Sequence, residues 1–188
     1  MVLVPEIFML LSIPLLLTIG LSSVASLPNA DAVYQSDRRI PLVRQTDVLV
    51  VGGSFGSVVA AIEAAETGAA VLLVAPRNFV GDDLGGALEL WLDKEETVTG
   101  KLTSQLFSDT RITTPLNVKR SLEAAMLAAD VEFLLGSFPT DVLRDEKGRI
   151  AGVVIANRAG RQAILAKVVV EGTDWGAVAR MTRAEFQR

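Results

Sequence analysis

A glycine-rich turn between an apolar strand and an alanine-rich helix constrains the fold of this chain most. Residues 48–51 are all apolar, and a helix is expected from Gly56 to Thr67, with Gly68 as the residue that ends it. The turn between them combines glycine and serine with one aromatic residue: Gly52, Gly53, Ser54, Phe55, Gly56 and Ser57. This pattern predicts the first β-α unit of a dinucleotide-binding fold, whose backbone N–H groups and helix N-terminus face a pyrophosphate.

The turn departs from the G-x-G-x-x-G pattern at two positions. Gly52 fits the first position, but Ser54 and Ser57 occupy the third and the sixth. Serine is small, so a phosphate is still expected to approach closely, and the Ser54 hydroxyl can donate a hydrogen bond to it. Ser57 is expected to loosen the packing of the helix on the strand, because the sixth glycine allows close contact there. A strand–turn–helix without a ligand is the alternative.

The second strand, residues 70–75, is also continuously apolar, which is typical of a parallel sheet buried on both faces. An acidic residue is expected about 20 residues after the first glycine, where it would hold a ribose. The sequence has Ala75 there, followed by Pro76 and Arg77. Arg77 is either a phosphate contact, as in NADP sites, or a solvated loop residue.

Asp82 and Asp83 form an acidic pair in the glycine-containing loop that follows. They either bind a ribose or cap a helix that begins near Leu84, and capping is the simpler interpretation. A short helix is expected near residues 102–107.

The rest of the sequence completes an α/β domain. A helix is expected over residues 115–129, with a core face that contains Leu116, Leu122, Met126 and Ala129. After a strand at residues 132–135, turns at two glycines indicate a three-stranded antiparallel meander. The expected segments are strands 140–144, 150–157 and 162–165, a buried strand 167–171, and a last helix after Gly176.

The composition excludes several classes of function. The formal net charge is −4, which argues against a nucleic-acid partner, and the chain has no histidine and no cysteine. A Ser-His-Asp triad, a cysteine nucleophile, a disulfide and the usual zinc or haem ligand sets are therefore impossible within it. General acid–base chemistry would need Asp, Glu, Lys or the single tyrosine, Tyr34.

Residues 1–32 are expected to be a signal peptide or an N-terminal anchor. The apolar run at residues 7–21 is shorter than the ~20 residues of a comfortable membrane span, and small-residue cleavage patterns follow it. It lacks preceding Lys or Arg, so an uncleaved anchor with membrane contact through residues 7–21 and a misassigned start codon are alternatives. The protein is thus expected to be exported, to the periplasm or the cell exterior, or membrane-anchored, with residues 33–46 as a linker.

The chain resembles the N-terminal portion of an FAD-dependent oxidoreductase of the glutathione-reductase-like FAD/NAD(P)-binding superfamily. Four blocks carry the resemblance through their order and spacing: DVLVVGGSFGSVVAAIEAAETGAAVLLV, PRNFVGDDLGG, TPLNVKRSLEAAMLAADVEFLLGS with the meander TDVLRDEKGRIAGVVIANRAGRQAILA, and AKVVVEGTDWGAVAR. The resemblance implies an α/β Rossmann-like FAD/NAD(P)-binding domain with a three-stranded antiparallel β-meander over residues 47–188. Relatives continue further, so this domain is expected to be C-terminally truncated and incomplete.

The resemblance also implies FAD as the cofactor, bound in an extended form. Residues 52–57 would meet the pyrophosphate, and Val142 would meet the adenine through its backbone. Thr173 and Asp174 would lie near the flavin-side phosphate. Three departures from the family pattern weaken the expected site: Ser57, Ala75, and the sequence 172–174, where relatives commonly show Ala-Thr-Gly.

Three functions follow from these patterns. The leading one is the FAD-binding segment of a flavin-dependent oxidoreductase that acts on an unknown small molecule, with no catalytic residue assigned and the substrate domain absent. The second is an NAD(P)-binding module with Arg77 on the 2′-phosphate. The third is a degenerate, non-catalytic remnant that keeps the fold.

Overall fold

The computed structural model describes residues 39–107 and 110–186. The expected signal peptide or anchor, residues 1–32, and the membrane contact through residues 7–21 lie outside them. Within the described residues, no helix combines the length and the apolar character that a membrane crossing requires.

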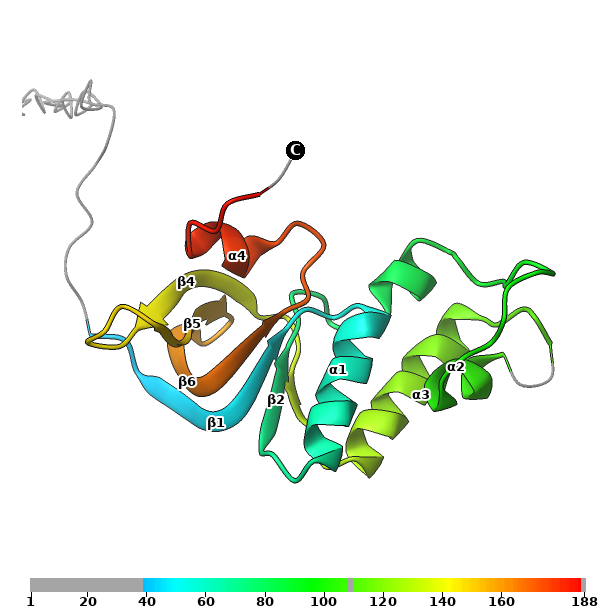
Figure 1. Cartoon of the computed structure of the whole chain (residues 1–188), viewed down its shortest axis with the longest axis horizontal. Coiled ribbons are helices and arrows are strands. Elements are labelled where there is room, and N and C mark those ends of the chain that lie inside the picture. Colours follow the sequence, from blue (N-terminus) through cyan, green and yellow to red (C-terminus); the bar gives the residue numbers. More distant parts are fainter. Residues whose placement is uncertain (1–38, 108–109, 187–188) are drawn as a thin grey trace, which may run out of the picture. The chain divides into compact units, whose positions relative to one another are not determined.

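The fold is built on one mixed sheet of six strands (Figure 1). Their bounds are β1 (Leu42–Val51), β2 (Val71–Val74), β3 (Glu132–Leu134), β4 (Phe138–Arg144), β5 (Ile150–Asn157) and β6 (Gly160–Glu171). The spatial order is β3-β2-β1-β6-β5-β4, and β3, β2, β1 and β6 run parallel. β4, β5 and β6 pair antiparallel. The Rossmann-like α/β class and its antiparallel meander are thus confirmed.

The described helices are short to medium in length. They are α1 (Phe55–Glu66), α2 (Lys101–Leu106), α3 (Pro115–Ala128) and α4 (Ala177–Met181), with a π-helical turn over Asp82–Gly86. α1 packs on β1 and β2, and α3 packs next to α1, whereas α4 packs on the meander side against β4 and β6 (Figure 1).

Two strands are longer than the sequence pattern predicts. β1 begins at Leu42, so residues 42–46 belong to the sheet and not to a linker. β6 runs unbroken from Gly160 to Glu171, where two separate strands were expected. The reason is that residues 163–165 pair with β5 on one side and with β1 on the other, which carries one strand from the meander into the parallel sheet.

β2 and the C-terminal half of β1 are buried on both faces, as their continuous apolar runs predict. On the helix side, Val50 of β1 and Leu73 of β2 pack with α1 and α3. On the other side, Leu49 and Val74 pack with Ile155 and other residues of the meander and with α4. Each fully buried aliphatic side chain of this kind stabilises the fold by about 1.5–3 kcal/mol.

The helix predicted over residues 115–129 is confirmed, but its expected core face is partly wrong. Val118, Leu122 and Met126 are fully buried, whereas Leu116 is 63% exposed. The N-cap explains the register: the Thr114 hydroxyl accepts a hydrogen bond from the Asn117 N–H at 3.2 Å, and Pro115 starts the helix. The buried stripe therefore follows i, i+4, i+8 spacing from residue 118.

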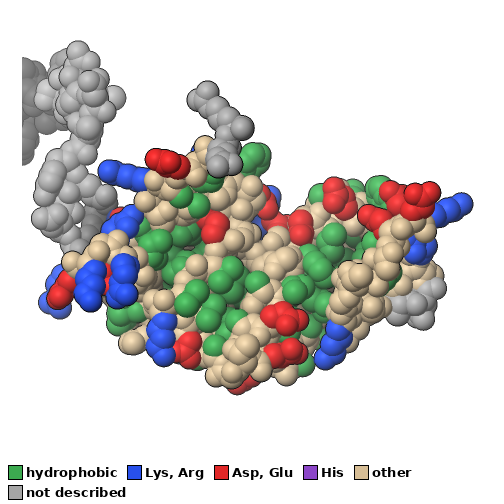
Figure 2. Space-filling model, viewed as in Figure 1, with side chains coloured by type: hydrophobic (Ala, Val, Ile, Leu, Met, Phe, Trp, Pro, Cys, Tyr) green, Lys and Arg blue, Asp and Glu red, His purple; other side chains and the backbone are tan. Residues whose placement is uncertain are grey.

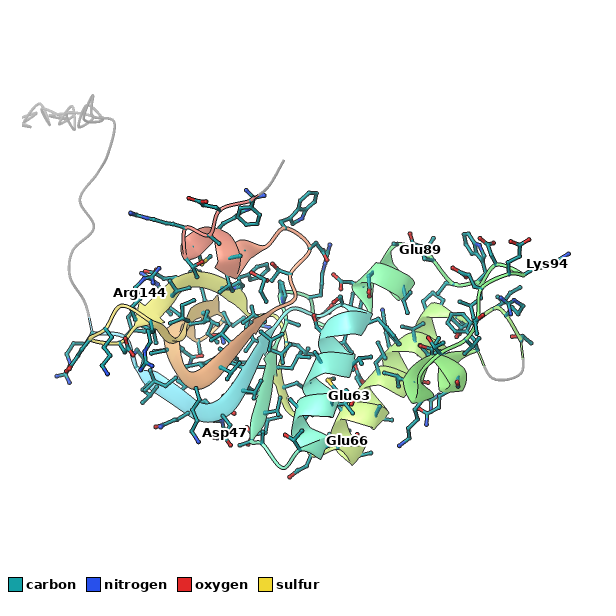
Figure 3. The ribbon with its side chains drawn as sticks, in the orientation of Figure 1. Asp47, Glu63, Glu66, Glu89, Lys94 and Arg144 are labelled. Carbon is teal, nitrogen blue, oxygen red and sulfur yellow. The ribbon has the colours of Figure 1, made fainter. Side chains whose placement is uncertain are left out.

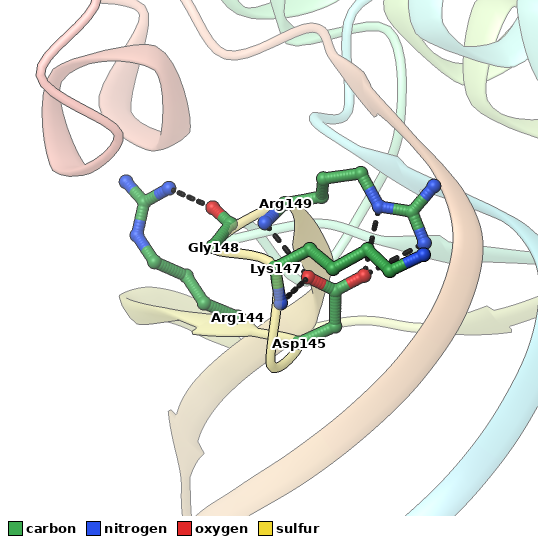
Figure 4. Close-up of polar contacts among 5 residues, drawn as sticks. All are labelled: Arg144, Asp145, Lys147, Gly148 and Arg149. Atoms are coloured by element: carbon green, nitrogen blue, oxygen red, sulfur yellow. Dashed lines mark hydrogen bonds and ion pairs between the residues drawn. The ribbon is translucent and has the colours of Figure 1, made fainter.

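The turn between β4 and β5 is organised by Asp145 (Figure 4). Its Oδ1 accepts hydrogen bonds from the N–H groups of Lys147 and Arg149, both at 2.9 Å, and its Oδ2 lies 2.8 Å from the Arg149 guanidinium. The backbone hydrogen bond from Arg149 holds the pKa of Asp145 below its ordinary value of 3.8. On the other side of the turn, Arg144 donates to the Gly148 carbonyl. The predicted hairpin is thus confirmed.

Candidate functional site

The glycine turn lies where three neighbouring strands end. Gly52 follows β1 directly, and its N–H donates to the Val74 carbonyl of β2 at 2.8 Å. On the other side of β1, the Gly172 N–H donates to the Val51 carbonyl at 2.8 Å. Ligands of open α/β sheets bind at the carboxyl ends of strands, so this edge is the candidate functional site.

Close backbone contact explains Gly52. Its φ is +144°, and a Cβ there would lie 2.1 Å from the Gly172 carbonyl oxygen. Gly53 is also enclosed, because a Cβ would lie 3.1 Å from the Cβ of Ala75. Gly56 differs, since the nearest atom to a Cβ there is the Ser54 hydroxyl at 3.9 Å. The first turn of α1 is therefore open around Gly56.

The two serines bind to the protein itself. The Ser54 hydroxyl caps α1 by accepting from the Ser57 N–H at 3.1 Å, and the two hydroxyl oxygens are 2.8 Å apart. Ser57 is buried and donates to the Gly172 carbonyl at 3.0 Å. This contact ties α1 to the end of β6. The loosening of the helix–strand packing by Ser57 stays a prediction.

Ser57 and Gly172 also depend on each other sterically. A Cβ at position 172 would lie 2.2 Å from the Ser57 Oγ and 3.2 Å from its Cβ. Two apparent departures from the family pattern, serine at 57 and glycine at 172, thus occupy one shared space and compensate each other.

Asp83 caps a different helix from the one that the sequence pattern predicts. Its two carboxylate oxygens both lie 2.9 Å from the backbone N of Phe55, the first residue of α1. Asp83 therefore caps α1 and not a helix near Leu84, and its negative charge lies at the positive end of the helix dipole. Burial raises the pKa of Asp83, although the hydrogen bond from Phe55 acts in the opposite direction.

Arg77 lies in the loop after β2, and its side chain is 67% exposed. Its Nε is 3.6 Å from Oδ2 of Asp82, and its carbonyl accepts from the Gly136 N–H at 2.9 Å. The exposed position agrees with a solvated loop residue, and a phosphate contact by Arg77 stays a prediction.

Glu171, the last residue of β6, is a structural residue that sequence reasoning missed. Its carboxylate accepts hydrogen bonds from the N–H groups of Thr173 at 2.8 Å and Ala179 at 2.9 Å, and also from Val178. The Thr173 hydroxyl accepts from the Ala177 N–H at 2.8 Å. Together they fix the turn before α4. A side chain that caps a helix six or more residues later falls outside the local capping patterns that sequence reveals.

The remaining predicted site residues are placed as follows. Thr173 follows Gly172 and so lies beside the glycine turn, while Asp174 is exposed on the next turn. Val142 lies on the edge strand β4, opposite Val153, and its N–H donates to Oδ1 of Asp141 at 2.9 Å. Contacts of these three residues with a cofactor stay predictions.

Two hollows differ in how they lie relative to the glycine turn. The first lies away from the turn, and the second reaches it only at Phe55. One, of about 360 Å³, lies at the opposite edge of the sheet, among Arg44, Gln45 and Gly68, near Asp47 in Figure 3. The other is a groove of about 720 Å³ between α1, α2 and α3, which includes Phe55 and Ile62. Hydrophobic side chains also spread across the middle of the face in Figure 2, with charged groups interspersed. The position at the strand ends, and not the depth of a hollow, identifies the site.

Three solved structures illustrate the fold that this chain shares. A geranylgeranyl bacteriochlorophyll reductase-like protein from Thermoplasma acidophilum is 18% identical with a TM-score of 0.54, and the match covers 73% of this chain and 42% of that one. THI4 from Thermovibrio ammonificans is 17% identical with a TM-score of 0.52, covering 74% and 62%. L-proline dehydrogenase from P. horikoshii is 15% identical with a TM-score of 0.52, covering 78% and 58%.

At these identities the likeness shows the fold alone. The chain spans 42% to 62% of the length of these three structures. No relative was found among curated protein sequences. A sequence model of the family described as FAD dependent oxidoreductase matches residues 47–188, which begin in the middle of β1. The chain therefore belongs to the FAD-dependent oxidoreductase family, and FAD is the cofactor that this membership indicates.

Proposed function

We propose that this chain is the FAD-binding segment of a flavin-dependent oxidoreductase, with FAD extended along the carboxyl ends of β2, β1 and β6. The observation that supports this most is the open first turn of α1. The helix begins at Phe55, directly after the glycine turn, and Gly56 has no side chain that covers the start of the helix. The neighbouring N–H groups of Phe55 and Ser57 are held by the side chains of Asp83 and Ser54. Such a terminus favours a pyrophosphate through both hydrogen bonding and its partial positive charge.

Different residues at the carboxyl ends of the strands hold different parts of the cofactor. Backbone groups of residues 54–56 face the pyrophosphate, and Thr173 faces the flavin-side phosphate. Bound FAD supplies the electron transfer, while the protein orients it and sets its surroundings. The substrate is a small molecule whose binding groups lie outside the assigned residues.

The Asp83 carboxylate has to release the Phe55 N–H when the cofactor binds. Its carboxylate lies on the Phe55 N–H, where a phosphate oxygen would bind, and both groups are anions. The side chain belongs to the π-helical turn Asp82–Gly86 and not to α1, so a rotation about its side-chain bonds frees the N–H without unfolding α1.

Gly56 offers a test in which only one charge changes. In the full chain, Gly56→Asp places a carboxylate in the first turn of α1, where the helix dipole favours it but a bound pyrophosphate repels it. Gly56→Asn has nearly the same shape and no charge. Titration with FAD, followed by quenching of flavin fluorescence, gives the dissociation constants of all three proteins.

The expected result is FAD binding by the original chain and by Gly56→Asn, with at least about 10-fold weaker binding by Gly56→Asp, equivalent to about 1.4 kcal/mol. The thermal unfolding temperature of Gly56→Asp should match or exceed that of Gly56→Asn. Equal FAD affinity of the two variants would contradict a pyrophosphate at this helix end. A folded original chain that leaves free FAD unquenched at every concentration would contradict FAD binding.

A further inference from the structure

The loop after β2 lacks the acidic residue that a ribose usually requires. Ala75 is fully buried, and its side chain has no group that accepts a hydrogen bond from a hydroxyl. Its carbonyl is also engaged, since it accepts from the Ser137 N–H at 3.0 Å. If FAD binds as proposed above, its adenosine ribose needs another acceptor near the end of β2.

The carboxylate of Asp82 lies against the same glycine as Ala75. A Cβ on Gly53 would be 3.1 Å from the Cβ of Ala75 and 3.8 Å from Oδ1 of Asp82. Ala75 and Asp82 are seven positions apart in the sequence, yet the fold places both side chains beside the glycine turn. A carboxylate is thus present beside the glycine that the residue at the end of β2 also contacts.

Backbone contacts hold Asp82 in this position. The preceding Gly81 donates its N–H to the Gly53 carbonyl at 2.6 Å, and the Asp82 carbonyl accepts from the Ala87 N–H at 3.0 Å. The Asp82 side chain is only 17% exposed. The loop is therefore tied directly to the glycine turn, and the carboxylate is preorganised beside it.

Asp82 and Asp83 contact different partners, and so do the two carboxylate oxygens of Asp82. Oδ2 of Asp82 lies toward the exposed Arg77 at 3.6 Å, whereas Oδ1 lies toward Gly53. Asp83 is directed instead to the Phe55 N–H. The acidic pair thus has two separate roles, one at the helix end and one beside the end of β2.

We propose that Asp82 accepts the hydrogen bonds of the adenosine ribose hydroxyls and so replaces the acid missing at position 75. This assignment rests on the FAD site proposed above. A carboxylate at this point favours a free ribose diol and repels a 2′-phosphate, so it selects FAD and other adenosine diphosphates over NADP-type ligands.

The test measures how much the two ribose hydroxyls contribute to nucleotide affinity. The full chain is titrated with ADP and with 2′,3′-dideoxy-ADP, which differ only in the two ribose hydroxyls, and with FAD as the reference ligand. The original chain should bind ADP about 10-fold to 100-fold more tightly than the dideoxy analogue, as expected for hydrogen bonds to a charged acceptor. Asp82→Ala should bind the two analogues equally, and Asp82→Asn should show a smaller preference than the original chain.

Asp83→Asn is the matched control, because it removes the adjacent charge and leaves Asp82 in place. Because Asp83 lies where the pyrophosphate would bind, this variant changes the affinity for both nucleotides, but it should keep the ratio of their dissociation constants. Circular dichroism melting of each variant establishes that a lost preference does not come from unfolding, and Asp82→Asn keeps the side-chain shape if Asp82→Ala proves unstable.

The outcomes separate this proposal from the one on which it rests. FAD binding without a preference for ADP in the original chain, or a preference that survives in Asp82→Ala, overturns the role of Asp82 and leaves FAD binding intact. A folded chain that binds neither FAD nor ADP overturns the FAD site, and the assignment of Asp82 with it.

Discussion

The shared space of Ser57 and Gly172 makes a quantitative prediction about stability. Gly172→Ala adds a Cβ that would lie 2.2 Å from the Ser57 Oγ, so either the hydroxyl or the backbone has to move. Overpacking of this kind costs about 2 kcal/mol of unfolding free energy, within a range of about 1–3. For a chain of 188 residues, this lowers the melting temperature by about 4–8 °C.

A change at the other residue of the pair, Ser57→Gly, is destabilising for different reasons. Ser57→Gly removes the hydrogen bond to the Gly172 carbonyl, about 1 kcal/mol, and adds a helical glycine, about 0.5–1 kcal/mol. In the double variant the added methyl group enters the space that the hydroxyl has left, with the Val51 carbonyl oxygen next nearest at 3.4 Å. The double variant should therefore be about as stable as Ser57→Gly alone, which gives a coupling energy of about 2 kcal/mol.

Denaturant unfolding of the original chain, the two single variants and the double variant measures this coupling. Gly56→Ala combined with Gly172→Ala serves as the control, because the Cβ at position 56 enters open space and the two changes should be additive. A coupling energy for Ser57 and Gly172 within about 0.5 kcal/mol of zero, the limit expected for independent sites, would refute the reasoning.

Two further predictions concern the core and the acidic loop. Met126→Ala should lower the unfolding free energy by about 2–5 kcal/mol, because it leaves a cavity in the core. Leu116→Ala, at an exposed position, should change the unfolding free energy by about 0.5 kcal/mol or less. Similar values for the two variants in urea unfolding would contradict the buried stripe of α3. Burial raises the pKa of Asp83, so its contribution to stability is fully present below the ordinary value of 3.8 and is lost as the pH rises through the folded pKa. Unfolding free energies measured from acidic to neutral pH should therefore show the original chain losing stability relative to Asp83→Asn, and a constant difference between the two would count against the raised pKa.

Most of the architecture could be predicted because it depends on local patterns. Continuous apolar runs gave β1 and β2 their two-sided burial, and the glycine turn gave the start of α1. The meander followed from turn residues such as Gly148, which has a φ of +76°. Local patterns did not predict the pairing of residues 42–46 with β6, because polar residues on an extended strand resemble a linker until its partner is known.

The candidate site was less predictable, since its key contacts join residues far apart in the sequence. The backbone of Phe55 meets Asp83, and Ser57 meets Gly172 across 115 positions. A comparison position by position therefore treats Ser57, Ala75 and Gly172 as three separate losses. In the fold, Ser57 and Gly172 complement each other, and the carboxylate of Asp82 lies near Gly53, the glycine that Ala75 also contacts. The departures from the pattern are thus weaker evidence of a degenerate site than their number implies, and cofactor binding by this edge should be judged from these contacts.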